Sequence, residues 1–587
     1  MATWGVRLIL KGLTVRLPRA LSRGLSLALV LSPWALAWAQ VPPEPSAPGV
    51  IPSAQQLQQG REAVQAPPSS RAEVPAPAPL PRELGKPADD ITLDVSAYEV
   101  DGLADVPRDV LAKVTAPYVG QGRSYEDLVD AAAAVSRYMQ RELGYYLGHA
   151  YLPEQAPKDG VVHIAIMEGR LDQVMLQWPD KMLVQREVVE RYLARLRPGE
   201  ILRVRDVERV VFLVNDLQGI RARFEVKAGR YPGTASLLVT PQSESRFSGR
   251  AEFDTNGSRF SGTDRVSLLG TVASPTGRGD GLVANALAST NGGLAFVLAS
   301  YVTPVGADGL KLGASASKVN YQLDKNEFPM DMNGSATAVN VFGLYPFVRS
   351  RNLNVFSLLT YEHKAFDDRR FGVSDKKSSD DVLVGVVGDF RDNVLNGGVN
   401  TYELNWLQGR MSFDSTIGLT PTNPDFGKLS LGYSRLQNVV SNRLLMYLRY
   451  KGQLSTTNLD TTERFSLGGP TGVRGFAPGE ATADEGHLVS AELRFLPYDS
   501  WFGRASREMV FSLFYDWGQA KLRHDPSGED SQFVNTSTLS SVGLGAIWDR
   551  PQSFGLRVNV AWPLSGEAKN DQVRRVPRAF ATVTKYF

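Results

Sequence analysis

Hydrophobic and polar residues alternate along the carboxyl-terminal part of the chain, as they do in β-strands with one apolar and one polar face. Between positions 511 and 518, one face carries Phe511, Leu513, Tyr515 and Trp517, and the other carries Ser512, Phe514, Asp516 and Gly518. Such alternation recurs from about residue 245 to Phe587, interrupted by Gly, Asn, Asp and Ser turns. About 340 residues, at about 20 residues per strand and connection, predict about 16 antiparallel strands. Apolar faces suit lipid and charged faces suit water, so an all-β transmembrane barrel with a hydrated interior is predicted over residues 244–587.

A soluble β-sandwich or propeller is the structural alternative for this region. No blade repeat is apparent, and the amino terminus carries the features of an export signal. Five basic residues between Arg7 and Arg23 precede an apolar run over residues 25–36, and Ala37-Trp38-Ala39 forms a small-x-small cleavage site. A signal peptide over residues 1–39 is therefore predicted in preference to a membrane anchor, which favours the barrel over its soluble alternatives.

Two α+β modules are predicted between the amino-terminal region and the barrel. In the first, over residues 91–176, Ser124 and Asp127 form a capping-box pattern at the start of a helix. The elements expected in this module are a strand at 91–100, a short helix at 107–118, the helix after Ser124, and strands at 145–152 and 161–174. The second module, over residues 177–243, is expected to contain helices at 184–196 and 203–217 and strands at 220–227 and 234–240. Each module would leave one sheet edge with unpaired backbone groups, which can serve as a docking site for an unfolded strand or belong to an inert spacer.

Proline-rich sequence flanks a short polar segment before these modules. Residues 53–65 read as a polar helix with few apolar positions, although Gly60 weakens that prediction. Residues 66–90 read as an extended proline-rich linker. Residues 40–65 are interpreted either as a disordered leader or, in preference, as a polar plug helix suited to a water-filled pore; the plug role is what a family resemblance, carried by the loop around Arg474, implies.

The most irregular stretch is the glycine-rich loop that contains Arg474. Gly472, Val473, Gly475 and Phe476 surround this arginine, and β-type alternation flanks the loop on both sides, with Val489, Ala491, Leu493 and Phe495 opposite Ser490, Glu492 and Arg494 downstream. Gly-x-x-Val-Arg-Gly-Phe in such a loop resembles the Val-Arg-Gly-[Tyr/Phe] loop of outer-membrane protein-translocating barrels. Within that superfamily, the chain resembles the two-partner secretion transporters of the haemolysin secretion and activation type.

The resemblance also assigns roles to a pair of charged residues. Phe514-x-Asp516-x-Gly518 matches the second barrel motif of the family, which receives the loop arginine. The resemblance therefore implies that Arg474 pairs with Asp516 and folds the loop into the barrel. The alternative is a solvated loop arginine and an ordinary carboxylate of the barrel interior.

Further sequence segments support the resemblance. Residues 151–169 look like the first polypeptide-transport-associated (POTRA) domain of the family, and residues 254–262, 279–280 and 300–306 resemble its opening barrel hairpins. The resemblance thus implies periplasmic POTRA modules in front of the barrel. It also implies that Phe587 belongs to a carboxyl-terminal signal read by the barrel assembly machinery.

Composition excludes several other classes of function. The chain has 587 residues, no cysteine and a net charge of +2, which argues against disulfides, thiolate metal sites and a nucleic-acid footprint. Only one long apolar run occurs, and the mean hydropathy is slightly negative, which argues against a helical membrane protein. Neither metal-ligand spacing among the histidines nor a nucleophile elbow or phosphate loop is found, so no catalytic, metal or cofactor site is predicted. Arg278-Gly279-Asp280 is interpreted as a hairpin turn rather than an adhesion tripeptide.

The resemblance implies export of one large partner protein through the barrel to the cell surface, without nucleotide hydrolysis. The expected client is a secreted exoprotein, whether adhesin, haemolysin or contact-dependent toxin. Outer-membrane lipid and the barrel assembly machinery are the other expected partners. The alternative within the superfamily is a factor that assembles or inserts other barrels; a passive porin or barrel enzyme would leave the modules unexplained.

Overall fold

The computed structural model describes residues 56, 59, 65–66, 92–103, 106–155, 157–328, 331–370, 372–414, 423–440, 443–529, 531–569 and 576–587. The predicted signal peptide (1–39), the linker (66–90) beyond Ala66 and most of the predicted plug region (40–65) lie outside them. Within that region Gln56, Gln59 and Gln65 are helical, and Gln56 and Gln65 are buried. Among the described helices, none combines the length and apolarity needed to cross a membrane.

The first module is a small α/β unit. Its elements are β1 (Leu93–Val95), β2 (Ala97–Asp101), α3 (Arg108–Thr115), β3 (Gly120–Arg123), α4 (Tyr125–Arg141), β4 (His149–Tyr151) and β5 (Val161–Met167). The sheet has the order β2-β5-β4, and β1 pairs with β3. Helix α4 begins at the predicted capping box, in which Ser124 and Asp127 bond each other's backbone amides. Ala132, Val135 and Met139 of α4 are buried in the module core.

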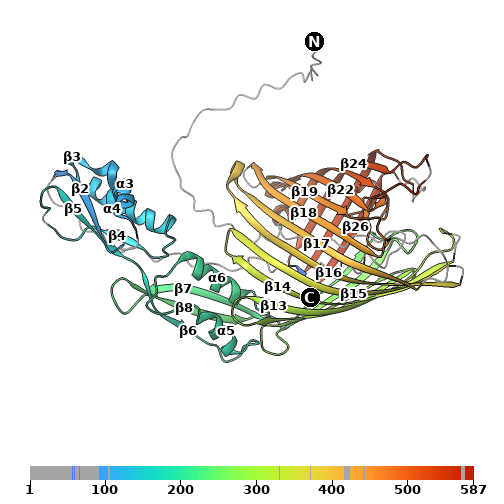
Figure 1. Ribbon diagram of the computed structural model, residues 1–587, viewed down its shortest axis with the longest axis horizontal. Coiled ribbons are helices and arrows are strands. Elements are labelled where there is room, and N and C mark those ends of the chain that lie inside the picture. Colours follow the sequence, from blue (N-terminus) through green and yellow to red (C-terminus); the bar gives the residue numbers. More distant parts are fainter. Residues whose placement is uncertain are drawn as a thin grey trace, which may run out of the picture. The chain divides into compact units, whose positions relative to one another are not determined.

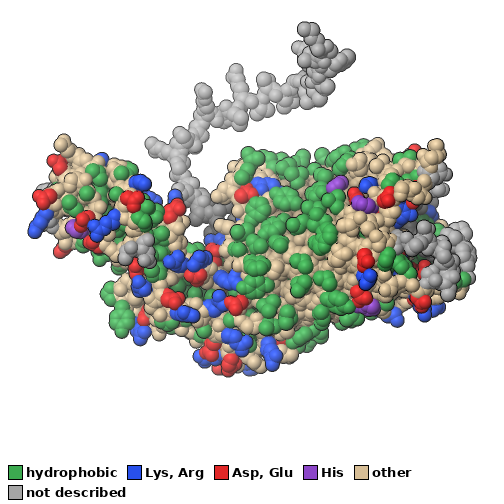
Figure 2. All heavy atoms as spheres, viewed as in Figure 1, with side chains coloured by type: hydrophobic (Ala, Val, Ile, Leu, Met, Phe, Trp, Pro, Cys, Tyr) green, Lys and Arg blue, Asp and Glu red, His purple; other side chains and the backbone are tan. Residues whose placement is uncertain are grey.

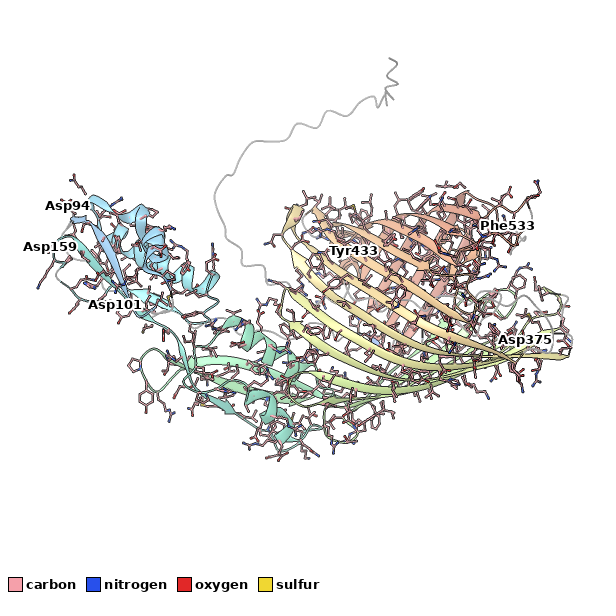
Figure 3. All side chains as sticks on the ribbon, viewed as in Figure 1. Asp94, Asp101, Asp159, Asp375, Tyr433 and Phe533 are labelled. Carbon is pink, nitrogen blue, oxygen red and sulfur yellow. The ribbon has the colours of Figure 1, made fainter. Side chains whose placement is uncertain are left out.

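Two strands expected to be continuous are interrupted. The strand predicted at 91–100 breaks at Ser96, whose amide donates to the carbonyl oxygen of Gly160 and whose hydroxyl donates to that of Asp159. Figure 3 labels Asp94 and Asp159 at this end of the module. The strand predicted at 161–174 breaks at Gly169, which has φ +71°. Its second half pairs in the next sheet, so the boundary predicted after residue 176 is corrected to Gly169.

The second module contains β6 (Arg170–Leu176), α5 (Arg186–Leu193), α6 (Val204–Asn215), β7 (Ile220–Ala228) and β8 (Thr234–Ser243). Its sheet has the order β6-β8-β7, with β6 parallel to β8. The predicted apolar stripe of α6 lies in the core, where Val207, Val210, Val211 and Val214 are almost completely buried. Helical spacing thus identified the buried face of this helix correctly.

Sixteen of the described strands close into one antiparallel barrel (Figure 1). They are β9 (Phe247–Asp254), β10 (Arg265–Ala273), β11 (Gly281–Ser289), β12 (Leu294–Val305), β13 (Leu310–Gln322), β14 (Met332–Arg349), β15 (Leu353–Arg370), β16 (Val373–Asp392), β17 (Gly398–Asp414), β18 (Asp425–Val440), β19 (Leu444–Ser455), β22 (Glu485–Phe495), β23 (Met509–Lys521), β24 (Thr536–Arg550), β25 (Phe554–Ser565) and β26 (Arg578–Tyr586). β26 pairs with β9, which completes the ring. The predicted fold class is confirmed.

The outer face of the barrel is apolar, as the alternation predicted. Outward side chains such as Val266, Val341 and Leu359 are exposed by half or more, whereas their strand neighbours point inward. In Figure 2 hydrophobic side chains form a continuous patch over the visible barrel face. Such a band matches the hydrocarbon layer of a membrane.

The inner face is more apolar than predicted. One buried cluster joins inward side chains of β14 to β18, among them Phe342, Phe356 and Leu383, with Leu459 from the connection after β19. Another joins β11 to β15 with Phe260 of the β9–β10 turn. The turn and the connection fold inward and cover these side chains, so the interior of the barrel combines packed apolar clusters with charged groups. The prediction of a hydrated lumen rather than a packed core is therefore corrected in part, because the described interior also contains packed apolar side chains.

The second module contacts the barrel through a buried ion pair. The guanidinium of Arg349, in β14, donates from Nε and Nη2 to both carboxylate oxygens of Asp216, at 2.9 and 2.6 Å. Asp216 follows α6, and the two side chains are 4% and 0% exposed. The Arg349 Cζ atom also lies 4.7 Å from the ring centroid of Phe212. This contact fixes the end of α6 against the barrel edge.

Replacing Asp216 with alanine is expected to destabilise this junction by about 3–5 kcal/mol, because Arg349 would lose its carboxylate while still buried. Limited proteolysis of the full chain should then cut faster between the second module and β9. Asp499→Ala is the matched control, because the Asp499–Arg507 pair is 48% and 76% exposed and an exposed pair contributes about 0–1 kcal/mol. Equal proteolysis of both variants and the wild type would contradict the expected role of Asp216.

Candidate functional site

The connection between β19 and β22, residues 456–484, folds into the barrel; we call it the inward loop. It contains one small hairpin, β20 (Phe465–Ser466) with β21 (Thr482–Ala483). Leu467, Val473 and Phe476 of the loop are almost completely buried. They pack in one cluster with Leu488 of β22, Ala520 of β23 and Leu539 of β24. The inward loop is therefore seated on the inner wall formed by β22, β23 and β24.

Glycines allow the loop to approach itself and the wall closely. A Cβ atom on Gly472 would lie 2.0 Å from the carbonyl oxygen of Leu467. A Cβ atom on Gly475 would lie 2.7 Å from Cβ of Ser541 in β24, and one on Gly518 would lie 2.7 Å from Cδ2 of Leu467. Real Cβ contacts are not that short, so no other residue fits at these positions without displacement.

Arg474 and Asp516 are in direct contact inside the barrel. Nε of Arg474 donates to Oδ2 of Asp516 at 2.9 Å, and Nη2 donates to Oδ1 at 2.8 Å. The backbone amide of Arg474 adds a third bond to Oδ2 at 3.1 Å. The arginine residue is 6% exposed and the aspartate is fully buried. Two parallel bonds from one guanidinium to one carboxylate define the orientation of both groups.

Other residues complete the arginine site. Nη1 of Arg474 donates to Oε1 of Glu492 at 2.8 Å, and the other oxygen of this carboxylate accepts from Arg494. The Ser490 hydroxyl accepts from Nη2 of Arg474 and donates to Asp516. Ser490 and Glu492 are predicted from the sequence to lie on the polar face of their strand, but the sequence did not connect them with the arginine. The sequence contained a signal for this assignment, because residues on the same face of the neighbouring strand had to lie near Asp516. Ser490 is the register partner of Asp516.

The remaining residues of the two motifs shape the site. The ring centroid of Phe514 lies 3.4 Å from Cζ of Arg474, so the guanidinium stacks on the ring. Phe514 is 1% exposed and lies over Gly543, where a Cβ atom would come within 2.2 Å of the ring. Ser541 donates to Oδ2 of Asp516 at 3.3 Å. The arrangement can hold one charged side chain in one orientation; it contains no nucleophile–base pair.

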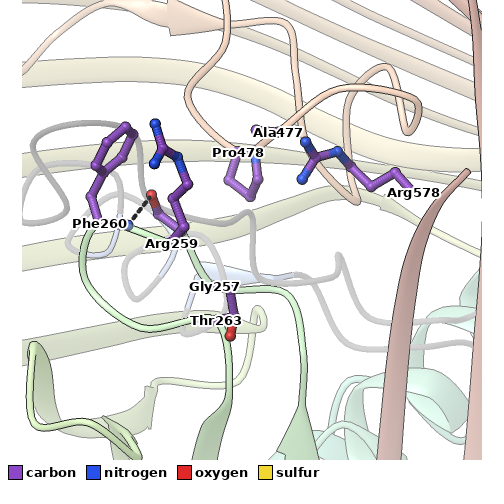
Figure 4. A pocket seen from close by; sticks show the side chains of 8 residues that line it. Gly257, Arg259, Phe260, Thr263, Ala477, Pro478 and Arg578 are labelled. Carbon is purple, nitrogen blue, oxygen red and sulfur yellow. Dashed lines mark hydrogen bonds between the residues drawn. The ribbon is translucent and has the colours of Figure 1, made fainter. Parts of the chain in front are cut away.

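The far side of the inward loop faces the β9–β10 turn across a small cavity (Figure 4). Ala477 and Pro478 of the loop line it, together with Arg259 and Phe260 of the turn and Arg578 of β26. The Arg259 guanidinium lies over the Phe260 ring, with 4.3 Å between Cζ and the ring centroid. The loop thus approaches two separate parts of the barrel.

Other residues singled out in the sequence lie away from the arginine. Phe587 exchanges backbone hydrogen bonds of 2.8 and 3.0 Å with Gly249 of β9, at the seam that closes the barrel. Asp254 pairs with Arg265 at 2.9 Å, and both are buried. Arg278, Gly279 and Asp280 lie in the β10–β11 turn, where the Asp280 carboxylate accepts from the Arg278 amide, in agreement with the predicted hairpin turn.

Comparisons with known proteins agree with this architecture. The family model of haemolysin secretion/activation protein ShlB/FhaC/HecB matches residues 233–546, and the model of the POTRA domain, ShlB-type, matches residues 93–169. The heme/hemopexin transporter protein HuxB of Haemophilus influenzae is 26% identical over 79% of this chain and 82% of its own length. The outer membrane transporter CdiB of Escherichia coli is 25% identical over 74% of this chain and 77% of its own. The solved structure of CdiB from Escherichia coli superposes with a TM-score of 0.67, at 21% identity, over 91% of this chain and 97% of that one.

Proposed function

Since the chain belongs to the haemolysin secretion/activation family ShlB/FhaC/HecB, we propose that it exports an unfolded partner protein from the periplasm to the cell surface through its barrel. The observation that carries the proposal is the combination of α/β modules with a closed barrel that encloses an arginine-anchored loop. A barrel with an apolar outer band belongs in the outer membrane, with its modules in the periplasm.

In this proposal the modules receive the client. The edge strands of the two sheets, β2 and β4 in the first and β6 and β7 in the second, have a neighbour on one side only in these sheets. An unfolded client strand can add to such an edge through its backbone groups, with little dependence on its sequence. The client is a large secreted exoprotein, and lipid and the barrel assembly machinery are the partners of the barrel itself.

The amino-terminal region acts as a plug in the same proposal. The Thr360 hydroxyl of β15 points into the barrel and donates to the side-chain oxygen of Gln65 at 3.2 Å. Gln56 and Gln65 are 3% and 5% exposed, as expected for residues enclosed by other parts of the chain. A polar helix at this place would have to leave before a client could pass. Arg474 and Asp516 meanwhile keep the inward loop against its wall.

The experiment needs a candidate client, which is sought as a large secreted exoprotein encoded next to the gene for this chain. Cells that express both proteins should carry the exoprotein outside, where added protease digests it, and cells that lack this chain should retain it in the periplasm. Export in the absence of this chain would overturn the proposal. If the amounts of other outer-membrane barrel proteins fell in cells that lack this chain, the result would instead support a role as a barrel assembly factor.

A further inference from the structure

The inward loop has a second charged contact, which involves residues that precede Arg474 in the chain. Its first part, residues 459–464, which we call the stem, contains Glu463. One oxygen of this carboxylate accepts from Nζ of Lys428 in β18 at 2.7 Å, and the other accepts from Nζ of Lys364 in β15. The Glu463 side chain is 3% exposed, and those of the two lysines are 4% and 8% exposed. One loop carboxylate therefore bridges two strands of the barrel wall.

Neighbouring contacts attach the same stem to the same part of the wall. Asp460 accepts from Nζ of Lys377 in β16 at 2.7 Å. The side-chain amide of Gln453 donates to the backbone oxygen of Glu463 at 3.2 Å. Leu459 is fully buried in the apolar cluster of β14 to β18. The stem is thus anchored on β15 to β19, whereas Arg474 is anchored on β22 and β23, and the loop spans the interior between them.

The two anchors differ in the contacts that break, and in the charged groups that lose a partner, when each anchor separates from the wall. Arg474 offers a planar fork to Asp516 and Glu492 and stacks on Phe514, so its removal breaks several oriented contacts together. The stem is bound by ammonium groups, which are point charges without a fixed direction. Lys364 also lies 2.6 Å from Asp381, so it keeps a carboxylate if Glu463 leaves. Of the two lysines bound to Glu463, only Lys428 would then lose its partner carboxylate, and water entering the interior can solvate it.

We propose that Glu463 is the releasable anchor of the inward loop: it holds the stem across the barrel interior at rest and separates from Lys364 and Lys428 when the interior opens, while Arg474 stays in place. Glu463 is a positioning residue in this role. The purpose of this release rests on the proposed export function, but the movement of the stem can be measured without a client.

The test uses the absence of cysteine from the chain. A single cysteine introduced by Thr462→Cys reports on the stem, and one introduced by Ala477→Cys reports on the part of the loop next to Arg474; both positions are less than 10% exposed. The full chain is reconstituted in phospholipid vesicles and treated with a polar maleimide. Adding Glu463→Gln should raise the labelling rate at position 462 at least about tenfold and change that at position 477 less than about twofold.

Wall-side and control variants make the result specific. Lys428→Gln should raise labelling at position 462 by a smaller factor, because Glu463 keeps its contact with Lys364. The double variant should not exceed Glu463→Gln alone, because that change already removes the ion pair with Lys428. Asp425→Asn is the matched control and should change nothing, since its pair with Arg410 is 57% and 71% exposed at the start of the same strand. Unchanged labelling at position 462 would overturn the proposal. An equal rise at both positions would also overturn it, because the loop would then move as one body.

A client assay separates this inference from the proposed function. Cells with Glu463→Gln should still export the exoprotein to at least about half the wild-type level, since the anchor that must stay in place is intact. Loss of export in that variant, with normal amounts of folded barrel, would overturn the releasable role of Glu463. If the wild type itself exported no client, the proposed function would fail, whereas the labelling result would still decide whether the stem is released separately.

Discussion

Replacing Arg474 with alanine is expected to reduce client export to less than about one tenth of the wild-type level and to leave the barrel in the outer membrane. Asp516 is fully buried and receives three of its hydrogen bonds from Arg474. Leaving a buried carboxylate without its partner costs about 3–5 kcal/mol, which is enough to displace the loop from the wall. The measurement is the amount of exoprotein outside the cell, together with barrel folding judged from heat-modifiable migration in gels.

Two further variants separate charge from geometry at this position. Arg474→Lys keeps the charge, but an ammonium group cannot reproduce the paired bonds to Asp516 together with the bond to Glu492, so export should remain close to that of Arg474→Ala. Arg410→Ala removes an arginine that is 71% exposed in its side chain, and export should stay normal. Normal export by Arg474→Ala would contradict the assigned role of the arginine.

Adding one methyl group at Gly475 is the second change with a large expected effect. The new Cβ atom would lie 2.7 Å from Cβ of Ser541 and 3.0 Å from the backbone nitrogen of Pro563. Relief of such overlap costs about 1–3 kcal/mol and corresponds to about a 5- to 150-fold shift in a two-state equilibrium. Gly475→Ala should therefore lower export within that range by moving Arg474 away from Asp516, although every charged group of the site is still present.

The matched control is Gly528→Ala, because a Cβ atom there meets open space. Its export should equal that of the wild type. If Gly475→Ala exported as much client as Gly528→Ala, the close approach of the loop to β24 would have no part in export.

The alternation of apolar and polar side chains was sufficient to predict the barrel and the side chains of each strand that point inward or outward. A strand has a period of two, so the inward direction of Asp516 and the outward direction of Leu513 follow from their neighbours alone. The apolar stripe of α6 and the capping box of α4 are similarly local features, and the structure reproduces both. The pairing of Arg474 with Asp516 came from two short motifs and their resemblance to a family.

Contacts between distant segments could not be predicted in this way. Whether Glu463 meets Lys428, or Asp216 meets Arg349, depends on strand register and on how far a loop folds inward. The strand predicted at 161–174 was divided between two sheets for the same reason, since its alternation continues while its partners change.

The sequence by itself determined the strands, their two faces, the helices of the modules and the arginine motif, because each depends on residues close together in the chain. The tertiary structure alone decided that the barrel interior is partly apolar, that Glu492 and Ser490 complete the arginine site, and that the inward loop has a second anchor. Inward-folding segments bring their own apolar and charged side chains against the wall, and such pairings are selected by three-dimensional proximity rather than by spacing along the chain.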